Sequence, residues 1–191
     1  GIKVAAPRDG SRLNELLRES IAITDGPSVI RFPKGQIADN LPAFERHQGV
    51  DVLYRGESAD VLLISVGAMA HSAVEAASLA YREGVGVTVV DPRWVRPLPE
   101  YLVALASRFA QVFVVEDGIE HAGVGSAFAE MVQEAGVAIS VTSIGVPQRF
   151  IEHSKRTEIL SDINLTPKAI AQRIVAAHSG KLAPISDPLR K

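Results

Sequence analysis

The sequence predicts an α/β protein: a three-layer sandwich with a mostly parallel, five-stranded sheet, preceded by a small β-α-β piece. Two observations predict this class. Short continuous apolar runs alternate along the chain with longer segments whose apolar residues recur at helical spacing, the pattern of a parallel sheet covered by helices on both faces. The chain also has 191 residues, 47% of them hydrophobic and 22% charged, which is enough apolar material to bury a core.

Residues 1–35 are predicted to form a strand, a helix and a second strand. The strands are residues 1–6 and 27–31, and the helix covers residues 10–24 with Asp9 as its N-cap. One helix cannot cover both faces of two parallel strands. Because the chain also begins inside a strand and without methionine, we expect this piece to be the truncated end of a larger domain.

Residues 36–49 are polar and lack periodicity, which indicates a linker, and residues 50–179 are predicted to be one compact α/β unit. Its short first strand, residues 52–54, is expected to pair antiparallel at an edge, and its four longer strands are expected to be parallel. The longer strands are predicted at residues 61–65, 86–90, 112–116 and 138–144, and the helices at residues 69–83, 99–109, 123–135 and 166–178. Residues 180–191 carry two prolines and are expected to be a loosely held tail.

Composition and charge argue against several function classes. The formal net charge is -2, with 20 basic residues scattered along the chain, so we expect no nucleic-acid partner. The absence of cysteine excludes disulfides and thiolate sites and fits a reducing cytoplasm. No apolar run approaches the ~20 residues that a membrane-spanning helix needs, so we expect no membrane association.

The segment Arg31-Phe32-Pro33-Lys34-Gly35 carries the candidate binding residue. It lies where the predicted second strand ends in a loop, and open α/β sheets bind ligands at the carboxyl ends of their strands. An ammonium group there can make charge-assisted hydrogen bonds to a phosphate. We therefore select Lys34 as the candidate substrate-binding residue, with a solvated loop lysine as the alternative.

Three other polar motifs are better explained by packing than by chemistry. The glycines of residues 123–125 precede a helix, but Phe128 takes the place of the third glycine of a dinucleotide-binding motif. The carboxylates Glu116 and Asp117 have no further ligands that must converge on a metal. We expect these loops, residues 116–125 and the proline-flanked residues 91–97, to be buried against another domain or subunit.

Five motifs occur together in one order: APRD (residues 6–9), DGPSVIRFPKG (25–35), VVDPRWVRPL (89–98), VEDGIEHAGVGS (115–126) and IGVPQRF (144–150). As a set they resemble the carboxyl end of the 1-deoxy-D-xylulose-5-phosphate synthase family, which are thiamine-diphosphate enzymes of the transketolase type. The middle motifs are shared with transketolases and with pyruvate dehydrogenase beta subunits. RFPKG and GVPQRF favour the synthase.

The resemblance implies condensation of pyruvate with D-glyceraldehyde 3-phosphate, with loss of CO2, in isoprenoid precursor and thiamine biosynthesis. It also implies that thiamine diphosphate and Mg²⁺ are held by domains outside this chain. Residues 50–179 would correspond to the third domain, which supports domain and dimer packing. The chain would then need the missing amino-terminal part, would be inactive alone, and would act within a cytoplasmic homodimer.

Lys34 matches a family position that is commonly arginine and binds the phosphate of the acceptor. Lysine keeps the charge but lacks the bidentate fork of arginine. Two alternatives remain open at this point: a beta subunit of a 2-oxo acid dehydrogenase, and a non-catalytic assembly module that dimerises without binding a ligand.

Overall fold

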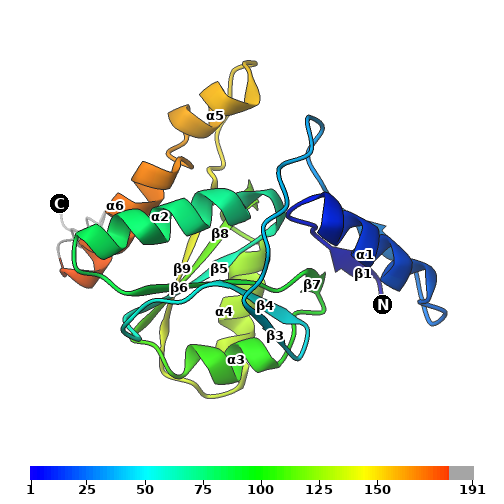
Figure 1. Cartoon of the computed structure of the whole chain (residues 1–191), viewed down its shortest axis with the longest axis horizontal. Helices are drawn as coiled ribbons and strands as arrows, with labels where there is room; N and C mark the ends of the chain where they lie inside the picture. Colours follow the sequence, from blue (N-terminus) through cyan, green and yellow to red (C-terminus); the bar gives the residue numbers. More distant parts are fainter. Residues whose placement is uncertain (181–191) are drawn as a thin grey trace, which may run out of the picture.

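The structure is a computed structural model that describes residues 1–180. Its strands form a three-stranded sheet in the order β2-β1-β7 and a six-stranded sheet in the order β3-β4-β6-β5-β8-β9 (Figure 1). The strands are β1 (Lys3–Ala5), β2 (Ser28–Ile30), β3 (Glu45–His47), β4 (Val50–Tyr54), β5 (Val61–Ser65), β6 (Val87–Asp91), β7 (Trp94–Arg96), β8 (Gln111–Ile119) and β9 (Ser140–Val146). The helices are α1 (Gly10–Ile21), the 3-10 turn η1 (Gly67–Met69), α2 (Ala70–Arg82), α3 (Tyr101–Ala106), α4 (Val124–Glu134), α5 (Arg156–Asp162) and α6 (Pro167–His178). The predicted tail falls, apart from Gly180, outside the described residues.

The large sheet is mixed and has six strands, which corrects the expected mostly parallel sheet of five. β6, β5, β8 and β9 are parallel to one another, as expected, and β4 pairs antiparallel with β6. However, β4 is not at the edge, because β3 pairs antiparallel with its outer side. β3 lies within the predicted linker. A tight turn at Gln48 and Gly49, both with positive φ (46° and 86°), joins it to β4, as is usual in a two-residue hairpin.

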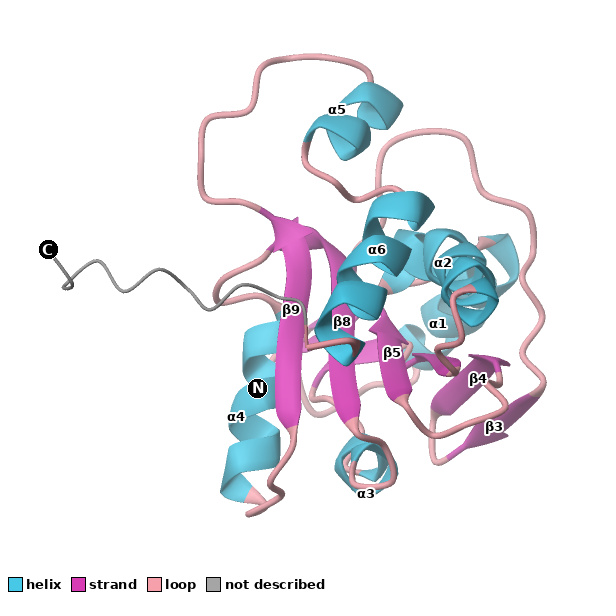
Figure 2. Cartoon of the chain, turned by 90° about the vertical axis from the view of Figure 1, so that its left-hand side faces the viewer, coloured by secondary structure: helices cyan, strands magenta, loops and turns pink. Residues whose placement is uncertain are grey.

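Helices cover both faces of the large sheet, so the α/β class is confirmed. Figure 2 shows α4 on one side of the sheet and α2 with α6 on the other. Alternate residues of β5 divide between two cores: Val61 and Leu63 pack with α2 and α6, whereas Leu62 and Ile64 pack with α3 and α4. This alternation is what a continuous apolar strand needs when both of its faces are buried.

The small sheet joins the beginning of the chain to the loop that follows β6. β1 is parallel to β2 and antiparallel to β7. Asp9 caps α1, since its side chain accepts a hydrogen bond from the backbone N–H of Arg12, as the sequence predicts. The helix ends at Ile21, three residues before the predicted end. The predicted β-α-β piece is therefore present, and β7 adds a third strand to it.

Candidate functional site

Lys34 lies just beyond the end of β2, at the carboxyl end of the small sheet. Its side chain is exposed and lines two neighbouring cavities, one of ≈ 700 Å³ and one of ≈ 380 Å³. The larger cavity is also lined by Pro7, Arg8 and Asp9, which follow the parallel strand β1. The cavity therefore lies where the carboxyl ends of two parallel strands meet, which is the usual place for a ligand in an open α/β sheet.

The loop that carries Lys34 is anchored at its start, and its sequence restricts the backbone farther along. At its start, the backbone N–H of Arg31 donates to the carbonyl of Ala5 at 2.8 Å, which extends the pairing of β1 and β2. Pro33 restricts the backbone in the middle. At its end, Gly35 has a φ of 156°, a conformation that residues with a Cβ rarely adopt. The RFPKG sequence thus specifies a defined turn that reaches toward α5 (Figure 1).

A buried carboxylate holds the base of this loop. Asp117 accepts hydrogen bonds from Nη1 of Arg31 and Nη2 of Arg156, each at 2.7 Å. The side chain of Asp117 is 4% exposed, whereas those of Arg31 and Arg156 are 45% and 42% exposed. Burial alone would raise the pKa of Asp117, but the two guanidinium groups lower it below its ordinary value. Asp117 is therefore an ionised link between β2, β8 and α5.

Sequence reasoning missed Arg156, which lines both cavities together with Lys34. Arg156 is the first residue of α5, a seven-residue helix with no buried residue. Such a helix has no apolar stripe by which a sequence pattern would reveal it. The only available signal was the basic pair Lys155-Arg156 after a polar stretch.

The neighbouring residue Glu116 lines neither of the two cavities and makes contacts that stabilise the fold. Its Oε1 accepts a hydrogen bond from the backbone N–H of Gly125 at 3.0 Å, which satisfies a donor at the start of α4. Burial raises the pKa of Glu116, an effect that the backbone N–H groups of Gly125 and Val124 partly offset. A Cβ on Gly123 would lie 2.5 Å from the same carboxylate. These contacts support the packing interpretation of the 123–125 glycines.

Residues 91–97 are also structural, as expected. Arg8, which follows β1, donates to Oδ2 of Asp51 and to Oδ2 of Asp91, each at 2.7 Å, and all three side chains are buried. Two further contacts join this loop to α1: Arg93 pairs with Glu19, and Nε1 of Trp94 donates to Glu19 at 2.7 Å. The loop therefore packs against residues 1–21 of the same chain.

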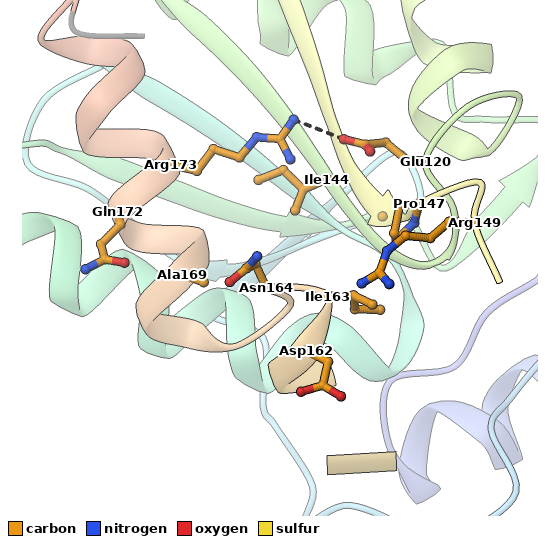
Figure 3. Close-up of a pocket in the computed structure, with 11 residues that line it drawn as sticks. Glu120, Ile144, Pro147, Arg149, Asp162, Ile163, Asn164, Ala169, Gln172 and Arg173 are labelled. Atoms are coloured by element: carbon orange, nitrogen blue, oxygen red, sulfur yellow. Dashed lines mark hydrogen bonds and ion pairs between the residues drawn. The ribbon is translucent and has the colours of Figure 1, made fainter. Parts of the chain in front are cut away.

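A third cavity, of ≈ 420 Å³, lies between β9 and α6 (Figure 3). The acidic side chains Glu120 and Asp162 balance the basic side chains Arg149 and Arg173 that line it. Nη2 of Arg173 pairs with Glu120 at 3.0 Å. With no net charge and no group poised for chemistry, this cavity is a weaker candidate than the one beside Lys34.

Residues 1–180 contain neither a clustered metal site nor a membrane-spanning helix. No group of three histidine or acidic side chains in this part of the chain is arranged to hold a metal ion. The same residues form no helix that combines the length and the apolar character needed to cross a membrane.

Comparison with known proteins identifies the family. The family described as "Transketolase, C-terminal domain" matches residues 51–170. Proteins named 1-deoxy-D-xylulose-5-phosphate synthase are similar over nearly the whole chain. The protein from Mycobacteroides abscessus is 47% identical over 188 residues, and the one from Frankia casuarinae is 42% identical over 191 residues. These matches cover 95% and 98% of this chain but 29% of each relative, so the chain spans less than a third of their length.

Solved structures agree with this assignment. A structure titled "Split gene transketolase, inactive beta4 tetramer" has a TM-score of 0.80 and 26% identity, and the match covers 94% of this chain and 59% of that one. A transketolase from Campylobacter jejuni has a TM-score of 0.70 over 92% of this chain and 26% of its own, at 15% identity, which supports the fold alone. The resemblance predicted from the five motifs is confirmed: the chain belongs to the transketolase C-terminal domain family, and its relatives include 1-deoxy-D-xylulose-5-phosphate synthases.

Proposed function

We propose that this chain is the carboxyl-terminal part of a 1-deoxy-D-xylulose-5-phosphate synthase. The observation that carries the proposal is the identity of 42–47% to proteins of that name over almost all of its residues. The complete enzyme would decarboxylate pyruvate and join the remaining two carbons to D-glyceraldehyde 3-phosphate, within a homodimer in the cytoplasm. This reaction would supply isoprenoid precursors and thiamine biosynthesis.

Thiamine diphosphate provides the carbanion chemistry in enzymes of this class, and the protein binds and orients the reactants. Among residues 1–180, no group of three histidine or acidic side chains is arranged to hold a metal ion. On the family resemblance, we propose that polypeptide outside this chain holds both the cofactor and its Mg²⁺. That this chain alone binds neither of them and is inactive stays a prediction.

Within this proposal, Lys34 contacts the phosphate of D-glyceraldehyde 3-phosphate. Three observations support the role: Lys34 follows the end of a parallel strand, it is exposed, and it lines the ≈ 700 Å³ cavity. A contact far from the reacting carbon can use the binding energy of the phosphate to orient the acceptor.

The rest of the chain would support assembly. Leu17 and Ile21 of α1 and Val29 of β2 are large apolar side chains that are exposed in this chain. They lie on the small sheet and its helix, which form only the end of a parallel-sheet domain. Additional polypeptide that continues this sheet would bury them, and each fully buried side chain of this kind contributes about 1.5–3 kcal/mol.

The test is a chimera in which this chain replaces the matching segment of the Mycobacteroides abscessus synthase. Lys34→Ala should lower kcat/KM for D-glyceraldehyde 3-phosphate by about ten- to a hundred-fold, since a charged hydrogen bond contributes roughly 1.5–3 kcal/mol. Pyruvate affinity should be unchanged, because pyruvate has no phosphate. Lys34→Arg should be tolerated, and Lys168→Ala, on an exposed site of α6, is the matched control. Equal losses for both substrates, or no loss for either, would identify Lys34 as an ordinary loop lysine.

A second candidate is a subunit of a two-chain enzyme, favoured by one observation. The solved structure with a TM-score of 0.80 is titled as a split-gene transketolase and as an inactive beta4 tetramer. By analogy, this chain would be a beta subunit that requires a separate partner chain, whether for a transketolase or for a 2-oxo acid dehydrogenase. Transfer of the two-carbon unit to a lipoyl domain instead of a phosphorylated aldehyde would favour the dehydrogenase. If the chain assembled with a partner chain but no tested acceptor received the two-carbon unit, a non-catalytic assembly module would be favoured.

A further inference from the structure

The wall between the two cavities beside Lys34 contains a second cationic side chain. Arg156 lines the larger and the smaller cavity, as Lys34 does. The two residues come from distant parts of the chain, the loop after β2 and the first turn of α5. Their convergence is therefore a property of the fold and not of a local motif.

The smaller cavity has an excess of positive charge. Its charged lining residues are Arg31, Lys34, Arg156 and Asp117, which gives a formal charge of +2. The only carboxylate among them already accepts hydrogen bonds from both arginines. By contrast, the charges that line the cavity of Figure 3 cancel. Like charges gathered without compensation favour an anionic ligand.

Arg156 is held in place by one contact, and most of its guanidinium N–H donors stay available to a ligand. Within residues 1–180 its guanidinium makes one hydrogen bond, from Nη2 to Asp117, although a guanidinium carries five N–H donors. Asp117 is buried on β8, in the irregular stretch between Val115 and Ile119, and these two residues pair with β9 on either side of it. An arginine fixed at one edge and open at the others is well suited to bind a phosphate.

We propose that Arg156 forms, together with Lys34, the binding site for a phosphate monoester. This inference rests on the proposed function and extends it, since it adds a residue from the third domain to acceptor binding. The charge is matched: a phosphate monoester carries about -1.5 to -2 at neutral pH, against the +2 of the lining side chains. Asp117 acts through Arg156, which it orients without touching the ligand.

The experiment titrates the 191-residue chain with glycerol 3-phosphate at low ionic strength and follows backbone amide resonances by NMR. Binding should shift the resonances of residues 32–35 and of α5, and glycerol, which lacks the phosphate, should not shift them. Arg156→Gln should raise the Kd about ten-fold or more, as expected for the loss of a charged hydrogen bond. Arg156→Lys should recover part of the affinity. Arg108→Gln, at an exposed arginine with no ion pair among the described residues, should have no effect.

The outcomes separate this inference from the proposed role of Lys34. An unchanged Kd in Arg156→Gln, with a raised Kd in Lys34→Gln, would overturn the inference and leave the role of Lys34 standing. A raised Kd in Arg156→Gln alone would support Arg156 and count against Lys34. If the unaltered chain did not bind glycerol 3-phosphate at millimolar concentrations, the site proposed here would be refuted. The chimera assay would still test the function. A native amide spectrum for each variant excludes misfolding as the cause.

Discussion

Replacement of Arg8 by methionine should destabilise the protein more than any other single change at the contact between residues 1–21 and the large sheet. Arg8 is 3% exposed and bridges the buried carboxylates of Asp51 and Asp91. It also donates to the carbonyl of Leu41 at 2.9 and 3.1 Å. Methionine fills a similar volume but supplies no donor, so the change removes these interactions without opening a large cavity.

The magnitude follows from what each partner retains. Loss of one member of a buried ion pair costs about 3–5 kcal/mol, because the other charge is left without compensation. Asp51 keeps its ion pair with Arg46, and Asp91 keeps one hydrogen bond from the backbone N–H of Arg93 at 2.8 Å. The expected cost therefore lies at the lower end of the range, about 3 kcal/mol, which corresponds to a fall in Tm of about 6–12 °C for a chain of this size.

The assay is urea denaturation followed by circular dichroism, with Arg18→Met as the matched control. Arg18 is also on α1 but is exposed and makes no ion pair within residues 1–180, so its replacement should change the free energy of unfolding by less than about 0.5 kcal/mol. A loss below about 1 kcal/mol in Arg8→Met would refute the reasoning. It would mean that the Arg8 cluster behaves like a solvated surface pair.

Two further variants test other contacts. Gly125→Ala should destabilise the protein by about 1–3 kcal/mol, because the new Cβ would lie 2.9 Å from the Cβ of Ser143. A second substitution in the same protein, Ser143→Gly, should restore part of the lost stability. A Gly125→Ala protein as stable as the unaltered chain would contradict the packing interpretation. Asp117→Asn should make the free energy of unfolding less dependent on pH in the acid range. The pKa of Asp117 is lowered in the folded state, so its carboxylate stabilises the fold above the ordinary pKa of 3.8. This stabilisation is lost as the pH falls through the folded-state pKa. Unfolding measured from about pH 6 down to about pH 3 should therefore have a shallower slope in Asp117→Asn than in the unaltered chain, and identical slopes would show that Asp117 is not linked to stability.

The elements that the sequence predicted well are those whose residues are buried on a regular pattern. β5 is apolar at nearly every position and buried throughout, and α2 buries alanines at helical spacing. The three missed elements lack this signal for separate reasons. β3 is an edge strand that consists of Glu45, Arg46 and His47, and it has no apolar side chain that a sequence pattern could reveal. β7 is three residues long and is flanked by Pro92 and Pro97, which suggested a loop. α5 buries no residue at all.

The residues of the candidate site also differ in whether the sequence could reveal them. Lys34 could be selected from the sequence because a strand exit is a local feature and the ligand rule for α/β sheets applies to it directly. Arg156 could not, because its position depends on a contact with Asp117 from a distant strand. The prolines and Trp94 of residues 91–97 indicated rigid packing against another domain or subunit, and the structure shows contacts of this loop with α1 of the same chain; burial against a second subunit stays a prediction.

Charge balance is the property that separates the two arginine clusters of this protein. Around Arg8, four arginines, at positions 8, 12, 46 and 93, are paired with five carboxylates, those of Asp9, Glu15, Glu19, Asp51 and Asp91. Such a cluster has no positive charge left to attract a ligand, and it ties the beginning of the chain to the large sheet. The smaller cavity beside Lys34 is lined by three cations, Arg31, Lys34 and Arg156, and by one carboxylate, that of Asp117, which pairs with the two arginines. Because Lys34 is exposed and the side chains of Arg31 and Arg156 are 45% and 42% exposed, solvent stabilises this charge in the free protein, and the charge stays available to an anion that enters the cavity.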